Sequence, residues 1–108
     1  MPTVYVTIGN SDDKLGQADW ATFRSATDDL IRRAAHEVHG AWVSPSADPW
    51  QNACWCFEIT DDPDADYCKT RWLRGRLENL AGAYGQDSIA WARASNVEFL
   101  SGKAVPDA

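Results

Sequence analysis

The stretch Thr3–Lys14 reads Thr-Val-Tyr-Val-Thr-Ile-Gly-Asn-Ser-Asp-Asp-Lys and joins an alternating segment to a polar loop. Its first six residues place an aliphatic side chain at every second position, which is typical of a strand covered on one face. Residues 9–13 are small or polar and favour turns. We therefore expect a first strand over residues 3–8 and a loop directly after it.

Two amphipathic helices are predicted on either side of the middle of the chain. Over residues 17–38 the apolar positions recur at steps of three and four, and His39-Gly40 is expected to end this helix. Asp19, or alternatively Asp12 or Asp13, is expected to cap or charge-stabilise its start. The acidic run Asp61–Asp66 favours the entry of a second helix, with Pro63 in its first turn, that continues to about Tyr84.

Three further strands are expected from β-type composition between turn signals. They cover residues 41–44, residues 51–60, and an interrupted segment of residues 88–94 and 97–100 with a bulge near Ser95-Asn96. The segment 51–60 is the longest, and its alternation places Ala53, Trp55, Phe57 and Ile59 on one face of a central strand.

The resulting order is β-α-β-β-α-β, the pattern of the ferredoxin-like split fold. Right-handed crossovers place the first and third strands at the centre of a four-stranded antiparallel sheet, with both helices on one face. We predict a single α+β domain over residues 1–100, because 108 residues suffice for one core. Residues 101–108 are expected to be a frayed tail.

The charge balance excludes some function classes. Sixteen acidic residues against ten basic ones give a net charge of −6, and the scattered basic residues disfavour direct nucleic-acid binding. No apolar run approaches the roughly 20 residues of a membrane-spanning helix, and no apolar leader is evident, so a cytoplasmic protein is expected. Three cysteines, at 54, 56 and 68, fit neither a disulfide framework nor a zinc knuckle, and we expect them to be reduced.

The predicted topology brings three polar segments to one end of the sheet. Amides, hydroxyls and carboxylates gather there beside two aromatic rings, a mixture suited to a small polar ligand or a protein loop. Ordinary turn chemistry is the alternative explanation of the same residue types. The predicted ligand-binding residues are Asn10, Ser11, Asp12, Asp13, Lys14, Trp50, Gln51, Asn52, Tyr84, Gln86, Asp87 and Ser88.

Metal and catalytic chemistry have weaker sequence signals. His36 and His39 are three residues apart on the predicted helix and could join a carboxylate at zinc, but a favourable helix C-terminus also explains them. Asp12 with Asp87 is the acid/base pair considered. We assign no metal ligand, cofactor or catalytic residue, and a small metal-assisted or acid/base enzyme stays the second alternative.

The sheet face without helices is a second candidate surface. Tyr5 should lie on it, and Trp42, Trp55 and Trp91 do not all fit the core. The residues 52–58 lack the basic, Gly- and Phe-rich signature of RNA-recognition strands. We therefore expect this face to mediate homodimerisation or contact with another protein.

Three segments carry a family resemblance: residues 8–15, residues 51–56 and residues 84–91. Together they resemble a small family of uncharacterised proteins from actinobacteria and their phages. The resemblance implies a phage or mobile-element accessory protein and no particular chemistry. The sequence hypothesis is thus a non-enzymatic binding module. Its first alternative is an acidic anti-defence protein that blocks a nucleic-acid-handling partner.

Overall fold

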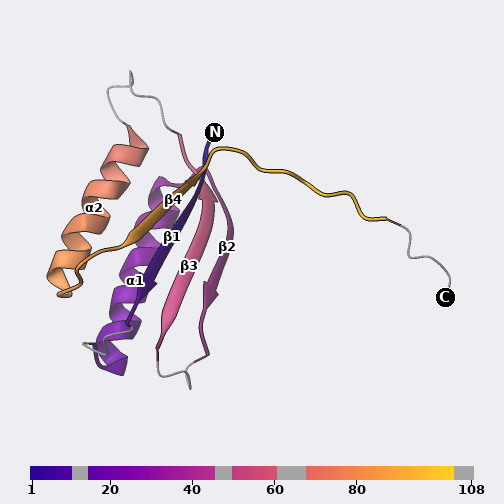
Figure 1. Cartoon of the computed structure of the whole chain (residues 1–108). Coiled ribbons are helices and arrows are strands. Elements are labelled where there is room, and N and C mark those ends of the chain that lie inside the picture. Colours follow the sequence, from indigo (N-terminus) through magenta and orange to yellow (C-terminus); the bar gives the residue numbers. More distant parts are fainter. Residues whose placement is uncertain (11–14, 46–49, 61–67, 104–108) are drawn as a thin grey trace, which may run out of the picture.

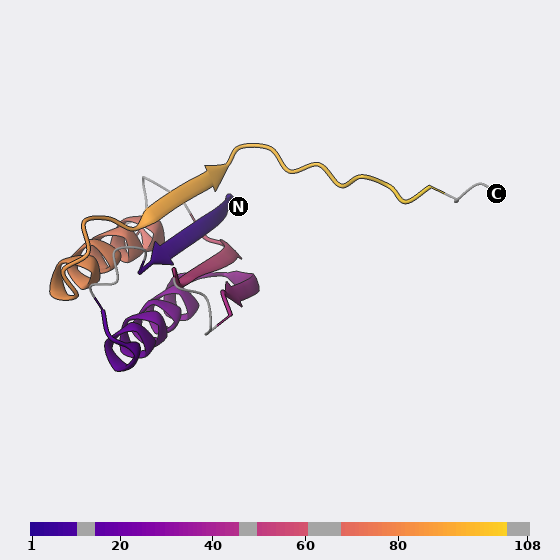
Figure 2. The ribbon, with the colours of Figure 1, turned by 60° about the horizontal axis from the view of Figure 1, so that its bottom comes forward.

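A computed structural model describes residues 1–10, 15–45, 50–60 and 68–103. The elements follow the order β1 (Thr3–Gly9), α1 (Gln17–Ala34), β2 (Glu37–Val43), β3 (Asn52–Glu58), α2 (Lys69–Ala83) and β4 (Ala90–Ala94). The strands form one antiparallel sheet in the order β2-β3-β1-β4. Both helices cover the same face of this sheet (Figures 1 and 2). The predicted ferredoxin-like α+β fold is confirmed, with β1 and β3 at the centre.

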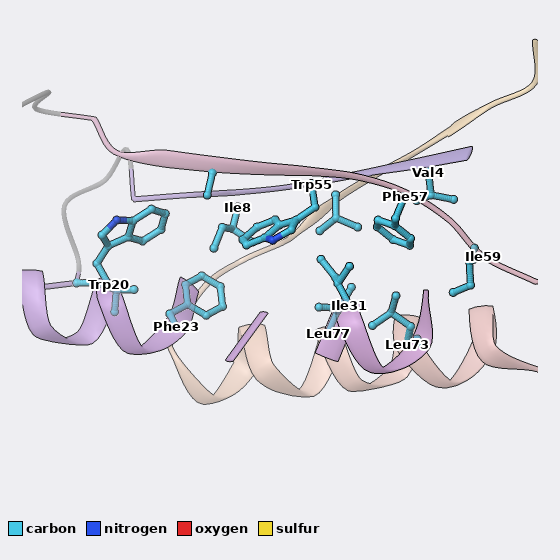
Figure 3. Close-up of a cluster of buried hydrophobic side chains, with 14 residues drawn as sticks. Val4, Ile8, Trp20, Phe23, Ile31, Trp55, Phe57, Ile59, Leu73 and Leu77 are labelled. Carbon is cyan, nitrogen blue, oxygen red and sulfur yellow. The ribbon is translucent and has the colours of Figure 1, made fainter. Parts of the chain in front are cut away.

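The core lies between the sheet and the helices (Figure 3). The alternating residues of β1 point into it, and β3 contributes Ala53, Trp55 and Phe57, which lie on one face of the strand. The helices supply the facing layer, including Phe23, Ile31, Leu73 and Leu77. Each fully buried large apolar side chain stabilises the fold by about 1.5–3 kcal/mol. The patterns of residues 3–8 and 51–60 therefore specify the inner face of the sheet.

A buried indole links the sheet to α1. Trp55 is 2% exposed, and its Nε1–H donates to Oδ1 of Asp28 at 3.0 Å. The same carboxylate accepts from Arg32 one helical turn later. The indole N–H of this buried side chain thus has a hydrogen-bond acceptor on the half-buried side of α1.

Helix α1 ends earlier than its apolar spacing predicts. The helix stops at Ala34, Ala35 is already extended, and β2 begins at Glu37 rather than at Ala41. Val38, counted in the helical stripe, pairs instead with Phe57 of β3. The prediction was wrong because a four-residue step from Ala34 to Val38 fits both a helix and a chain that turns into a strand. Pairing with β3 decides in favour of the strand.

Strand β4 is also shorter than predicted. It begins at Ala90 and ends at Ala94, which lies opposite Thr3, the first residue of β1. No partner residue of β1 is left beyond this point, so Val97–Leu100 forms no strand. Phe99 and Leu100 are 92% and 89% exposed, and the segment leads away from the sheet (Figure 1).

The helix starts differ from the predicted caps. Gly16 is the N-cap of α1 and makes no side-chain cap bond, while Asp19 lies in the first turn as expected. Helix α2 begins at Lys69 after the N-cap Cys68. The acidic run Asp61–Asp66, predicted as its entry, lies outside the described residues. Neither described helix has the length and apolarity needed to cross a membrane.

Candidate functional site

One end of the sheet carries a hollow formed by three segments that are distant in sequence. The end of β1, the residues that lead into β3, and the connection from α2 to β4 surround a volume of about 430 Å³. Six of the predicted ligand-binding residues line it, and the structure adds four others. The lining residues are Thr7, Ile8, Gly9, Trp50, Gln51, Asn52, Gln86, Asp87, Ser88 and Ala90.

Trp50 and Asp87 are the most accessible recognition groups at this hollow. Trp50 is 66% exposed. Asp87 is exposed too, and it is the only charged side chain among the described residues that line the hollow. A flat ring and a carboxylate therefore face solvent beside several amides and hydroxyls.

Asn10 has a structural role at this end. Its side chain is 3% exposed, its Nδ2 donates to the Leu15 carbonyl at 2.8 Å, and its Oδ1 accepts from the Leu15 N–H at 3.1 Å. Its backbone N–H donates to the Gln51 carbonyl at 2.8 Å. Asn10 thus holds the two ends of the loop after β1 together and ties them to β3, without lining the hollow.

Hydrogen bonds restrain the side chains of Gln51 and Gln86 to different degrees. Gln51 is 6% exposed, and its Nε2 donates to Oε1 of Gln17 at 3.3 Å, against the start of α1. Gln86 is half-buried, and its Nε2 donates to the Tyr84 carbonyl at 3.4 Å, a long bond. Gln51 therefore shapes the wall, whereas the Gln86 amide is weakly restrained and available to a bound molecule.

Tyr84 belongs to the core rather than to the hollow. Its ring stacks on Phe23 with centroids 5.1 Å apart, and it is half-buried. It was predicted at the site as one of the two aromatic rings, because it begins the connection from the second helix to the last strand. Four predicted residues lie outside the described residues, namely Ser11, Asp12, Asp13 and Lys14. The acid/base pair of Asp12 and Asp87 is therefore not described either.

A second hollow lies on the other side of the same connection. It has a volume of about 420 Å³, lies between α2 and β4, and shares Gln86, Asp87 and Ser88 with the first. The Arg74 guanidinium lies over the Trp91 ring at 5.4 Å and borders this space. The sequence offers one indication of this hollow. Trp91 lies in the last predicted strand, and Arg74 and Glu78 lie on the outer side of the second predicted helix.

The uncovered sheet face presents two exposed aromatic rings. Tyr5 is 41% and Trp42 is 56% exposed. A Cβ added at Gly40 would lie 2.7 Å from the Trp42 ring, so the indole lies directly over this glycine. Tyr5 is opposite Cys56 in the sheet, and a hydrogen bond with that side chain is the largest cause that raises the pKa of Tyr5. Of the three tryptophans left open by the sequence, Trp42 is exposed, Trp55 is buried and Trp91 is half-buried.

The histidines do not share a helical face. His36 lies in the bend after α1 and His39 lies on β2, because the helix ends at Ala34. Nε2 of His39 is 3.3 Å from Oε1 of Glu58 on β3. His36 contributes only its backbone N–H, which donates to the Glu58 carbonyl at 2.8 Å. The expected placement of both histidines on one helical face was wrong, and His39 has Glu58 as its neighbour instead.

The three thiols are free, as expected for reduced cysteines. Cys56 and Cys68 are buried, and Cys54 is half-buried in the middle of β3. Cys54 and Cys56 point to the uncovered face, since their neighbours Ala53, Trp55 and Phe57 fill the core. Burial restricts access to two of these thiols, in keeping with structural roles.

Comparisons with known proteins reach the fold and no further. No protein-family model matches the chain, and no curated protein matches it. The C-terminal domain of the MgtC protein from Mycobacterium tuberculosis is similar, with a TM-score of 0.56 and 11% identity over 91% of this chain and 93% of that one. A REP-associated tyrosine transposase bound to a REP hairpin is similar with a TM-score of 0.45 and 16% identity, over 89% of this chain and 58% of that one. The first likeness shows the fold alone, and the second is too distant to carry an argument.

Proposed function

We propose that this protein is a non-enzymatic binding module for a small polar ligand at the hollow beside Trp50. The observation that carries the proposal is the convergence of three segments, at residues 7–9, 50–52 and 86–88, on one space of about 430 Å³. This size falls within the roughly 300–1,000 Å³ of ligand pockets. The fold itself offers no preference, since many functions use it.

The lining defines the class of ligand. Amides of Asn52 and Gln86 and the hydroxyl of Ser88 donate and accept hydrogen bonds, which suits hydroxyl and amide groups on a ligand. The exposed Trp50 ring offers a flat apolar surface for a sugar or ring face. Asp87 disfavours an anion and favours an amino group. We therefore propose a neutral or cationic polyhydroxylated or amino-bearing molecule.

A thermal-shift screen of amino sugars, neutral sugars, nucleosides and polyamines tests this proposal. A ligand at a hundredfold excess over its Kd adds about 2.7 kcal/mol to the free energy of unfolding. Trp50→Ala and Asp87→Asn should each weaken binding of the hit at least about tenfold, because each removes one of the two most accessible recognition groups.

Matched controls come from outside the hollow. Trp42→Ala removes an exposed ring from the uncovered sheet face, and Asp29→Asn removes an exposed carboxylate from α1. Both variants should bind the hit with wild-type affinity. Loss of binding in Trp42→Ala with none in Trp50→Ala would place the ligand elsewhere and contradict the proposal.

A second candidate function is homodimerisation through the uncovered face, which Tyr5 and Trp42 favour because both rings are exposed there. Tyr5→Lys should shift the protein to monomer, since a charge is costly when it is buried at the centre of an interface. Native mass spectrometry across a dilution series measures this. Ser25→Lys, on the exposed side of α1, is the control and should leave the distribution unchanged. A monomeric wild-type protein at high concentration would eliminate this candidate.

We rank the anti-defence alternative below ligand binding and below homodimerisation. The net charge of −6 and the family resemblance support it, and partner binding should then weaken with salt. This alternative requires one contiguous negative face of Asp12, Asp13, Asp61 and Asp62, whereas the topology predicted from the sequence puts the two pairs at opposite ends of the sheet. All four residues lie outside the described residues. Cytoplasmic location and phage origin stay predictions of the sequence.

A further inference from the structure

The sheet edge at β2 holds one imidazole and two carboxylates in close proximity. Glu37 on β2 is the direct cross-strand neighbour of Glu58 on β3. The strand pairing shifts between Val38 and Gly40, so His39 sits in a bulge next to them. Nε2 of His39 is 3.3 Å from Oε1 of Glu58, and one ligand atom from each of the three residues lies within 4.8 Å of the others.

The fold explains why these side chains meet. Glu58 points to the uncovered face, like Cys54 and Cys56 at the same strand parity, and Glu37 lies opposite it. His39 follows Glu37 by two positions and so shares its face, and a bulge re-aims the side chain that it carries. All three groups are thus presented to solvent on one corner of the open face.

A bound cation would relieve a charge repulsion at this corner. Two carboxylates directly opposite each other in an antiparallel pair repel. One imidazole nitrogen and two carboxylate oxygens are, in addition, donors that Zn²⁺ accepts, and three protein ligands leave one coordination position for water. We propose that Glu37, His39 and Glu58 form a surface binding site for a divalent transition metal, with Zn²⁺ as the fitting ion.

The separation of His39 Nε2 and Glu58 Oε1 agrees with tetrahedral coordination. Zn–N and Zn–O bonds of about 2.1 Å place neighbouring ligand atoms about 3.4 Å apart. The His39–Glu58 pair is already at this separation. Glu37 is exposed, and its side chain is free to close the remaining distance by rotation. The site therefore needs no change in the backbone.

The site is independent of the proposed ligand hollow. Glu58 and Asn52 are six residues apart on β3, which separates the two places by about 20 Å. Failure of ligand binding at the hollow leaves the metal site untouched, and failure of metal binding leaves the hollow untouched.

Calorimetric titration of ZnCl₂ into the metal-free protein, in a buffer that does not chelate zinc, tests the site. One Zn²⁺ should bind per chain. His39→Gln, Glu37→Gln and Glu58→Gln should each reduce the affinity at least about tenfold. His36→Gln and Glu78→Gln, which remove an imidazole and an exposed carboxylate outside the cluster, should stay within about twofold of the wild type. An absence of saturable binding, or an equal effect of His36→Gln and His39→Gln, overturns the proposal.

Two further measurements separate ligation from folding and from thiol binding. Glu37→Gln relieves the carboxylate repulsion, so without metal its Tm should equal or exceed that of the wild type, while the zinc-dependent rise in Tm is lost. The Co²⁺-substituted protein should show ligand-field absorption without the intense thiolate-to-cobalt charge-transfer band. A strong thiolate band would assign the metal to cysteines and overturn the site.

Discussion

Replacement of Phe57 by alanine is expected to lower the free energy of unfolding by about 3–5 kcal/mol. The side chain is 0% exposed on the central strand β3, and its ring meets Trp91 edge-to-face with centroids 6.2 Å apart. Truncation removes apolar burial from the middle of the layer shown in Figure 3 and leaves a cavity that the sheet cannot close. Urea unfolding followed by tryptophan fluorescence measures the loss.

The chain provides a control of the same residue type. Phe99 is 92% exposed beyond the end of β4, and Phe99→Ala should change the free energy of unfolding by less than about 0.5 kcal/mol. Phe57→Leu, which keeps most of the volume, should lose clearly less than Phe57→Ala and stays measurable if the alanine variant does not fold. Equal losses for Phe57→Ala and Phe99→Ala would contradict this assignment of the core.

Asn10→Ala is expected to cost about 2–4 kcal/mol, because two hydrogen bonds to Leu15 disappear and leave a buried N–H and a buried carbonyl without their partner. The sequence predicted a ligand contact at this position, whereas the structure places the side chain inside the loop closure. Chemical denaturation and ligand affinity, measured together, distinguish the two roles.

The matched control for Asn10 is Asn79→Ala on the exposed side of α2, which should change stability by less than about 0.5 kcal/mol. A stable Asn10→Ala protein that no longer binds the hit ligand would restore the original prediction and contradict the structural role. A destabilised protein whose folded fraction binds normally supports it.

The sequence predicted which segments line the hollow, because the order of strands and helices alone brings these segments to one end of the sheet. Trp50 and Gln51 precede β3, Asn52 begins it, and Gln86–Ser88 precede β4. The ferredoxin-like order brings these segments to the end where β1 finishes. The direction of each side chain was not predictable. Asn10 turns inward to Leu15 and Tyr84 stacks on Phe23, because each finds a partner that no local pattern identifies.

The Glu37–His39–Glu58 cluster is a second case in which local sequence patterns do not identify the partners of a side chain. From the sequence, His39 belonged to a helix and had His36 as its neighbour. In the structure β2 starts at Glu37, and a register shift within it brings His39 to Glu58, nineteen positions away in sequence. A bulge depends on how two strands fit each other, and one strand alone does not reveal it.

The alternating stretch at residues 3–8 determined by itself that a strand forms and which of its faces is buried. Local periodicity is sufficient for this, since the side-chain direction along a strand depends only on position. Only the tertiary structure decided where α1 and β4 end and which polar groups meet. These features depend on the partners that distant segments supply: Phe57 recruits Val38 into the sheet, and β1 has no residue left to pair beyond Ala94.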